Sequence, residues 1–125
     1  LNPQGFLGDT KGDRLISNMS PLIIESENGI TTIGSPGADR ISSAIAQVLL
    51  NFSINKNWKE AIDKPRFHVN GDGSVRAEPG SLEIDENITV TDEYDMYFGG
   101  VCVSGLNNDI FSFGDKRRGD TSWVS

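Results

Sequence analysis

The segment Gly34-Ser35-Pro36-Gly37-Ala38-Asp39-Arg40-Ile41 connects a β-rich run to the best helix of the chain, and the predicted fold is built around it. Apolar side chains recur after it with the three- and four-residue spacing of a helix that buries one face. Asp39 stands where a side-chain oxygen can cap the first turn of that helix. We therefore predict a helix over residues 39–52, with its apolar face formed by Ile41, Ala44, Ile45, Val48, Leu49 and Phe52.

Short β-rich runs surround this helix on both sides. Upstream, residues 19–24 and 30–33 flank an Asn28-Gly29 pair, which is a strong hairpin signal. Downstream, a shorter helix is predicted over residues 57–63 and must end before Pro65. Because strands and helices come in separate blocks, their order predicts an α+β fold with both helices on one face of a mostly antiparallel sheet. Further β-rich runs lie at residues 88–91, 99–103 and 110–113, with a turn at residues 107–109, while residues 75–78 and 81–84 are short strand or turn candidates.

The length and charge of the chain limit what it can be. Its 125 residues are the size of one domain, so we treat residues 1–125 as a single domain, with a predicted loop over residues 1–14. The formal net charge of −7 argues against a nucleic-acid surface, because phosphate contacts need clustered basic side chains. No run approaches the roughly 20 apolar residues of a membrane span. The single cysteine, Cys102, excludes an internal disulfide.

Two loops carry groups that suit ligand binding. Residues 17–21 place small hydrogen-bonding side chains just before a strand, where they either bind a carboxylate or cap their own turn. The glycine-rich turn at residues 34–38 runs into a helix N-terminus, which leaves backbone N–H groups unpaired beside the positive end of the helix dipole. Such donors suit the oxyanion that develops during acyl transfer, but they also suit any bound anion or an ordinary strand-to-helix turn.

Two further segments carry charged side chains. His68, in Pro65-Arg66-Phe67-His68, is the only histidine and has no cysteine near it in the sequence, so no metal site is predicted. Arg66 could neutralise either a buried carboxylate or backbone carbonyls. In the basic turn at residues 114–120, an arginine could bind a carboxylate through its two-pronged guanidinium, or the turn could simply be solvated.

Taken in order, four segments resemble the small subunit of γ-glutamyltransferases, and together they span nearly the whole chain. Lys11-Gly12-Asp13-Arg14-Leu15-Ile16-Ser17-Asn18-Met19-Ser20-Pro21 is similar to the family's Pro-Gly-Lys-Arg-Pro-Leu-Ser-Ser-Met-Ser-Pro-Thr. The stretch at residues 34–41 is similar to Gly-Ser-Pro-Gly-Gly-Ser-Arg-Ile. Glu60-Ala61-Ile62-Asp63-Lys64-Pro65-Arg66-Phe67-His68 resembles a Glu-Ala pair followed by Ala-Pro-Arg-Phe-His. Phe113-Gly114-Asp115-Lys116-Arg117-Arg118-Gly119 resembles the family's Gly-Ala-Ser-Asp-Pro-Arg-Arg-Gly.

This resemblance implies a fold, an activity and partners. Family members have a four-layer αββα sandwich of the N-terminal-nucleophile hydrolase type, and their precursor cleaves itself to expose a catalytic threonine. That threonine is expected upstream of Leu1, so the expected partners are the large subunit and the N-terminal part of the small subunit. The expected substrate is a γ-glutamyl or related amide, with peptidoglycan-processing, polyglutamate-processing and cephalosporin-type acylases as variants. Neither a metal nor a cofactor is expected, and the resemblance implies an extracytoplasmic location.

The resemblance also assigns roles to residues of this chain. Gly37 and Ala38 fall on the two glycines whose N–H groups form the oxyanion hole. Ser17 and Asn18 fall on the paired serines that hold the α-carboxylate of the substrate. These four residues are therefore the expected core of the site in this segment.

Departures from the family pattern bear on specificity. An alanine at position 38 keeps its backbone donor without strain only at negative φ, and Asn18 can still donate through its amide although it is larger than serine. Strict glutathione specificity is therefore not expected. Arg117 or Arg118 is expected to point at the acyl site and to pair with a carboxylate of substrate or protein. The competing hypothesis is a non-catalytic relative that has lost acyl transfer, and a threonine at an upstream self-cleavage junction would distinguish the two.

Overall fold

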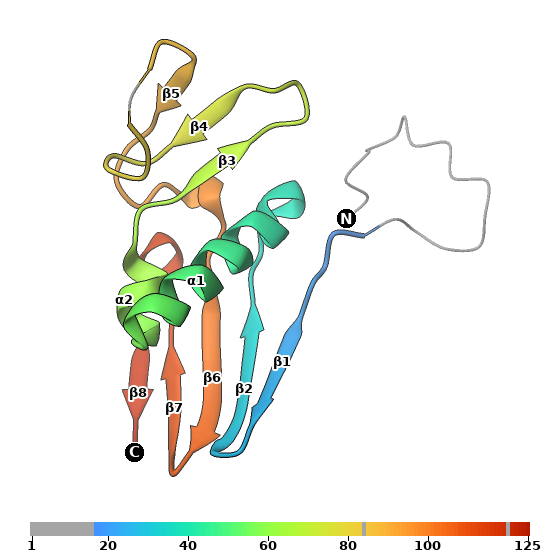
Figure 1. The fold of residues 1–125 in the computed structure, drawn as a ribbon, viewed down its shortest axis with the longest axis vertical. Coiled ribbons are helices and arrows are strands. Elements are labelled where there is room, and N and C mark those ends of the chain that lie inside the picture. The colour runs from blue at the N-terminus through green and yellow to red at the C-terminus, as the bar shows by residue number, and fades with distance from the viewer. Residues whose placement is uncertain (1–16, 84, 120) are drawn as a thin grey trace, which may run out of the picture.

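The main sheet of the protein is built from both ends of the chain. The computed structural model describes residues 17–83, 85–119 and 121–125, so the loop predicted over residues 1–14 lies outside the described residues. The sheet contains β1 (Leu22–Ser26), β2 (Gly29–Gly34), β6 (Cys102–Asn107), β7 (Asp109–Phe113) and β8 (Ser122–Val124). These strands run antiparallel in the order β1-β2-β6-β7-β8 (Figure 1). Strands separated by the helices in the sequence are thus neighbours in space.

Two tight hairpins shape this sheet, at the two turns that the sequence predicted. Glu27 and Asn28 turn β1 into β2, so that Ser26 pairs with Gly29, the first residue of β2. A Cβ atom at Gly29 would lie 1.8 Å from the Leu106 carbonyl oxygen, so only glycine allows β2 and β6 to approach this closely. Asn108 turns β6 into β7 with φ +60°, in the left-handed region that asparagine tolerates.

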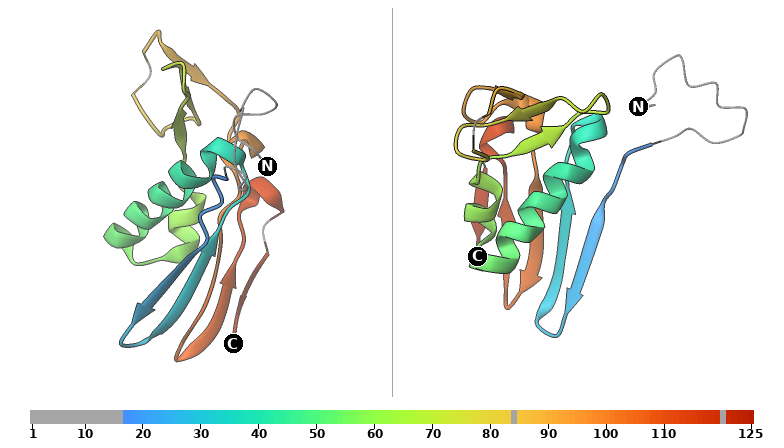
Figure 2. Two further views of the ribbon diagram at one scale, coloured as in Figure 1. Left: turned by 90° about the vertical axis from the view of Figure 1, so that its right-hand side faces the viewer. Right: turned by 45° about the horizontal axis from the view of Figure 1, so that its top comes forward.

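Two helices cover one face of the main sheet (Figure 2), which confirms the predicted α+β architecture. They are α1 (Ile41–Asn55) and α2 (Trp58–Asp63), and the Asn57 side chain caps α2 by accepting the Glu60 N–H at 3.1 Å. No helix among the described residues is long and apolar enough to cross a membrane. The core between helices and sheet contains Ile33, Ile41, Ala44, Ile45, Val48, Ala61, Ile62, Val101 and Val103.

A second, smaller sheet lies beyond one end of the main sheet, near the N-terminal end of α1 (Figures 1 and 2). It contains β3 (Phe67–Val69), β4 (Val75–Ala77) and β5 (Ile88–Val90). β3 pairs with β4 in the antiparallel sense, whereas β4 and β5 are parallel. Gln47 of α1 donates to the Phe67 carbonyl at 2.8 Å and accepts the Phe67 N–H at 3.1 Å. The small sheet is therefore attached directly to α1.

The opposite face of the main sheet carries no helix among the described residues (Figure 2). The strand register places Ile30, Leu106 and Ile110 in one row across this face, and all three side chains are exposed. An apolar sheet face normally packs against another layer. The described chain thus has one helix layer and one sheet layer, as expected of one half of an αββα sandwich.

Several predicted boundaries differ from the structure. α1 begins at Ile41 because the preceding residues form the 3₁₀ turn η2 (Ala38–Arg40). The prediction that Asp39 caps the helix is wrong, since neither η2 nor α1 has a side-chain cap and Asp39 forms an ion pair with Arg40. Of the two short segments left open as strand or turn, residues 75–78 contain β4, whereas Ser81 and Leu82 form bends, and residue 84 lies outside the described residues. β3 and β8 were not predicted.

Candidate functional site

A pocket of about 260 Å³ brings together the two loops that the sequence singled out for ligand binding. Ser17 and Asn18 line it together with Gly37 and Ala38. The loops meet because β1 and β2 are paired, so the segment that enters β1 lies beside the segment that leaves β2. The predicted carboxylate and oxyanion residues therefore share one cavity, whose other lining residues are Met19, Ser35, Pro36 and Ile41.

The loop at Gly37 presents backbone donors that the described part of the chain does not use. Pro36 has no N–H, and the N–H groups of Gly37 and Ala38 donate to no acceptor among the described residues. The Gly37 carbonyl accepts the Arg40 N–H at 3.0 Å, which closes η2. The two free donors lie where the dipoles of η2 and α1 add partial positive charge. This backbone can therefore bind an anion.

Close packing against a second glycine fixes the position of this loop. Gly37 has φ +135°, a conformation that side chains rarely adopt, and a Cβ atom there would lie 3.3 Å from the Gly99 Cα. Gly99 has φ +84°, and its own Cβ would lie 2.7 Å from the Pro36 carbonyl oxygen. The two glycines thus let the loop pack directly on the segment that leads into β6. Any side chain at either position would push the two segments apart.

Ala38 adopts the left-handed backbone conformation, with φ +53°. The sequence analysis expected an unstrained donor only at negative φ, and the structure does not meet that condition. A residue with a Cβ in this conformation costs about 1–2 kcal/mol relative to the right-handed one. Such strain is often found at functional sites, where the surrounding structure holds it in place. Ala38 therefore keeps the backbone shape of a glycine loop at some cost in stability.

At the end of the pocket expected to bind a carboxylate, residues 17–20 form some hydrogen bonds with one another. Ser17 is exposed, and its Oγ accepts the Met19 N–H at 3.1 Å, which is the turn-capping contact that was the alternative to ligand binding. Its hydroxyl hydrogen can still donate to a ligand. The Asn18 carbonyl accepts the Ser20 hydroxyl at 3.1 Å, while the Asn18 side-chain amide makes no hydrogen bond with the described residues. Both side chains therefore keep a donor for a substrate.

Ser35 is a pocket residue that the sequence analysis missed. Its Oγ donates to the Pro36 carbonyl at 2.8 Å and accepts the Gly100 N–H at 3.3 Å. These contacts tie the loop before η2 to the start of β6. A serine before proline was the only signal in the sequence, and it is too common to identify such a role.

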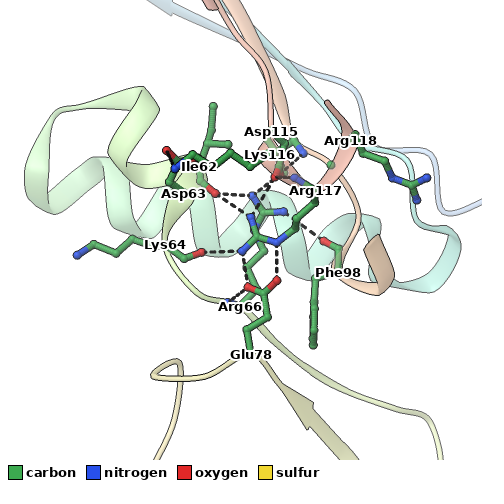
Figure 3. Close-up of polar contacts among 12 residues, drawn as sticks. Ile62, Asp63, Lys64, Arg66, Glu78, Phe98, Asp115, Lys116, Arg117 and Arg118 are labelled. Atoms are coloured by element: carbon green, nitrogen blue, oxygen red, sulfur yellow. Dashed lines mark hydrogen bonds and ion pairs between the residues drawn. The ribbon is translucent and has the colours of Figure 1, made fainter. Parts of the chain in front are cut away.

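Arg117 lies in a buried network and does not face the pocket. All five of its guanidinium N–H groups are used inside the protein, by the carboxylates of Glu78 and Asp115 and the carbonyls of Ile62 and Lys64 (Figure 3). Burial alone would lower the pKa of Arg117, but its hydrogen bonds and ion pairs with the two carboxylates raise it above the ordinary value. Arg117 therefore pairs with protein carboxylates, and this arrangement leaves it no donor for a substrate.

Arg66 completes this network with a second guanidinium. Its Nη2 lies 2.8 Å from the Asp115 Oδ2, and both side chains are buried. Arg66 also donates to the carbonyls of Ile62 at 2.9 Å and Phe98 at 3.2 Å. Burial lowers its pKa, while the Asp115 carboxylate opposes that effect. The sequence left open whether Arg66 neutralises a carboxylate or carbonyls, and the structure shows that it contacts both.

Arg118 points away from this network (Figure 3) and remains available at the surface. Its Nη2 donates to the Met96 carbonyl at 3.4 Å, and its aliphatic stem lies so close to Gly100 that a Cβ there would sit 2.2 Å from Cγ. Gly100 in turn donates to Ser35 of the pocket. A substrate contact by Arg118 stays a prediction, and of the two arginines it is the one with donors to spare.

The chain is similar to curated proteins over part of its length. A glutathione hydrolase proenzyme from Pseudomonas sp. (strain A14) is 39% identical over 59 residues, which are 46% of this chain and 10% of the relative. A glutathione hydrolase proenzyme from Bacillus subtilis (strain 168) is 35% identical over 69 residues, which are 54% of this chain and 12% of the relative. The chain thus spans only about an eighth or less of the length of these two relatives.

A solved structure and a family model extend this similarity. The crystal structure of the Bacillus anthracis transpeptidase enzyme CapD, crystal form II, matches with a TM-score of 0.74 and 22% identity, covering 95% of this chain and 77% of that one. At this level of identity the match concerns the fold alone. The sequence model of the Gamma-glutamyltranspeptidase family matches residues 10–97, more than half of the chain. The chain therefore belongs to the γ-glutamyltranspeptidase family.

Proposed function

We propose that the protein containing this chain hydrolyses or transfers γ-glutamyl or related acyl groups through an acyl-threonine intermediate. The observation that carries the proposal is the shared pocket, in which the Gly37 and Ala38 N–H groups, without an acceptor in the described part of the chain, lie with the donor side chains of Ser17 and Asn18. Acyl transfer from a γ-glutamyl amide needs one anion site for the oxyanion and another for the substrate carboxylate. Relatives named glutathione hydrolase proenzymes support the same substrate class.

In the proposed mechanism the nucleophile is a threonine from the rest of the precursor. Its hydroxyl oxygen attacks the carbonyl carbon of the amide, while its own α-amino group or a water takes the proton. The carbonyl oxygen becomes an oxyanion and accepts hydrogen bonds from the Gly37 and Ala38 N–H groups. The C–N bond then breaks, the amine leaves with the proton, and the acyl group remains on the threonine as an ester. Water or a second amine attacks that ester in the same way and frees the threonine.

The backbone of this loop suits the transition state better than the ground state. Its donors belong to a fixed turn that packs on Gly99, so they need little reorganisation when charge develops. The dipoles of η2 and α1 add a partial positive charge that an oxyanion feels more strongly than a neutral carbonyl does. Interactions that strengthen only in the transition state raise kcat. The loop is therefore assigned to catalysis and not to general substrate binding.

Asn18 is proposed to set the size of the carboxylate end of the pocket. Its amide can donate to a substrate carboxylate as a serine hydroxyl would, but its side chain is longer. The carboxylate would then lie farther from the backbone of residues 17–18 than it does against two serines. This geometry allows an acyl donor other than glutathione, in keeping with the polyglutamate-processing, peptidoglycan-processing and cephalosporin acylase variants.

The rest of the precursor is the proposed partner of this segment. Two observations support it: the relatives are named proenzymes, and the open face of the main sheet exposes Ile23, Ile30, Leu106, Ile110 and Trp123. A second sheet on this face would complete the αββα sandwich and bring the nucleophile to the pocket. The proposal includes an extracytoplasmic location, which fractionation of the source cells would test.

The decisive experiment is an activity assay on the full-length protein. We expect it to cleave itself at a threonine and to release a chromogenic amine from a γ-glutamyl anilide. Replacing that threonine with alanine should abolish both events. A full-length protein that has no such threonine, remains in one piece and releases no amine would instead be the non-catalytic relative.

A further inference from the structure

Two arginines from different elements lie over one tyrosine ring. Tyr97 belongs to the 3₁₀ turn η3 (Met96–Phe98), between β5 and β6. The guanidinium carbon of Arg40, in η2, lies 4.6 Å from the centre of the Tyr97 ring, and that of Arg76, in β4, lies 4.7 Å from it. Both distances are within the range of cation–π attraction. We call Arg40, Tyr97 and Arg76 the arginine–tyrosine cluster.

The Tyr97 ring that supports the cluster is held firmly. Its hydroxyl donates to the Asn70 side chain at 2.5 Å, and the His68 ring meets it edge-on at 6.3 Å. The Tyr97 carbonyl accepts the Arg40 Nε–H at 3.1 Å. A guanidinium stacked on a fixed ring has already lost part of its freedom, so it loses less when a ligand binds. The cluster is therefore pre-organised.

The two guanidinium groups differ in how well they are neutralised. Arg40 forms an ion pair with Asp39. Arg76 is exposed, and its guanidinium has neither a carboxylate nor a hydrogen-bond partner within residues 17–83, 85–119 and 121–125. The cluster thus carries an uncompensated positive charge on a chain whose formal net charge is −7. An anion attracted to this chain would find its best contact at Arg76.

The cluster adjoins the loop that holds the proposed oxyanion site. Arg40 is two residues after Ala38, and Gly99, one residue beyond η3, packs on Gly37. The views in Figures 1 and 2 place the β3–β4 hairpin, which carries Arg76, beyond the N-terminal end of α1. A peptide chain that extends from the pocket past the Gly37 loop would therefore pass the cluster.

We propose that the arginine–tyrosine cluster binds a carboxylate of an acidic peptide, which serves as acyl acceptor or leaving group of the enzyme. Arg76 offers a planar fork of N–H groups that fits a carboxylate with two hydrogen bonds. Arg40 adds attraction from the other guanidinium, although Asp39 competes for it. The assignment of the peptide as acceptor or leaving group rests on the proposed acyl transfer, whereas the binding itself does not.

The binding test uses the full-length protein and two fluorescently labelled peptides, a triglutamate and the matching triglutamine. We expect the wild-type protein to bind triglutamate more tightly, with a preference that weakens as salt is added. R76Q should lower the affinity for triglutamate by about two- to fivefold, as expected for one exposed ion pair. R76K should retain part of the affinity, because lysine keeps the charge but loses the planar fork. Because Arg76 is exposed and its guanidinium contributes one cation–π contact, with the Tyr97 ring, R76Q should lower the Tm only slightly and leave the protein folded.

The control variant is K56Q, which removes one positive charge at the other end of α1. That helix has 15 residues and lies between Arg40 and Lys56, so Lys56 is about 24 Å away from Arg40 along it. K56Q should change the affinity for triglutamate less than R76Q does. Equal binding of the two peptides by the wild-type protein, no measurable binding of triglutamate, or equal effects of R76Q and K56Q would each overturn the proposal.

A transfer assay then separates this inference from the proposed function. With a γ-glutamyl anilide as donor, R76Q should raise the KM for an acidic acceptor peptide and leave its kcat nearly the same. If the protein binds triglutamate through Arg76 but releases no amine from the anilide, the proposed acyl transfer is disproved while the proposed binding site is supported. Equal rates of γ-glutamyl transfer to acidic and neutral acceptor peptides, with neither KM changed by R76Q, would support the proposed acyl transfer but disprove the binding site at Arg76.

Discussion

Replacement of Gly37 by valine should test the oxyanion loop most directly. Gly37 has φ +135°, which valine rarely adopts, and a Cβ atom would lie 3.3 Å from the Gly99 Cα and 3.7 Å from the Arg40 Cβ. The first contact is with backbone, so it cannot be relieved by rotating a side chain. Valine adds two methyl groups beyond that Cβ, and the loop must therefore move away from Gly99 or change its φ. Either change turns the Gly37 and Ala38 N–H groups away from their present directions.

The expected effect follows from the loss of one oxyanion donor. Such a loss lowers kcat by about 10²-fold or more, equivalent to about 3 kcal/mol of transition-state stabilisation. KM should change much less, because the substrate carries no negative charge on its carbonyl oxygen in the ground state. The assay is steady-state release of the amine from a γ-glutamyl anilide by the processed full-length enzyme. Processing is followed on a gel, so that a failure to self-cleave is not mistaken for a loss of kcat.

A second glycine provides the matched control. Gly80 has φ +80°, and no atom of residues 17–83, 85–119 and 121–125 lies within 4 Å of an added Cβ, so G80A introduces backbone strain without such contacts and outside the pocket. Both variants should lose about 1 kcal/mol or more of stability, but only G37V should lose kcat. A G37V enzyme that self-cleaves normally and keeps its full kcat would refute the assignment of this loop to catalysis.

Four further outcomes are expected. R117A should lower the unfolding free energy of the full-length protein by about 3–5 kcal/mol, because it leaves two buried carboxylates with one guanidinium; urea melts should show no comparable loss for the exposed control R118A. A38G should raise the stability by about 1 kcal/mol, because it removes the left-handed strain at φ +53°, and a lower Tm would contradict that account. Burial lowers the pKa of His68 in the folded protein. As the pH drops below the usual value of 6.5, His68 of the unfolded chain therefore binds a proton before His68 of the folded protein does, and stability should fall. Melts at several pH values should show that this dependence is weaker in H68N. The 125-residue chain alone should release no amine from a γ-glutamyl anilide, and turnover above the buffer control would contradict the assignment of the nucleophile to the rest of the precursor.

The helices and hairpins of this fold could be predicted because their signals are local. The three- and four-residue spacing around Ala44 and Val48 identifies α1, and Asn28-Gly29 identifies the first hairpin. With three residues each, β3 and β8 are too short to display an alternating pattern; the equally short β4 and β5 were found only as short candidate segments without such a pattern. The start of α1 was misplaced because Asp39 has the chemistry of a cap, while in the structure its carboxylate pairs with the neighbouring arginine.

The candidate site was predictable only through the family resemblance. Composition alone could not distinguish ligand-binding loops from ordinary turns at residues 17–21 and 34–38, and the pairing of β1 with β2 was needed to bring them into one pocket. For Arg117 even the burial of the side chain could not be predicted from the sequence. A Lys-Arg-Arg turn looks solvated in the sequence, and nothing local reveals that Glu78, from a distant segment, meets it in the core. The arginine–tyrosine cluster likewise joins three elements that no periodic pattern connects.

Four buried charged residues form one network: Arg66, Glu78, Asp115 and Arg117. A substitution at one of them is expected to require a second substitution at another. Each guanidinium touches a carboxylate from another segment of the chain, and the four charges sum to zero. A single neutral replacement leaves one charge unbalanced in the core, whereas removing one acid and one base together restores neutrality. Among natural variants of this sequence, we therefore expect changes at these positions to occur as acid–base pairs. A designer who replaces the network should likewise start from a double substitution that removes Arg117 together with Glu78.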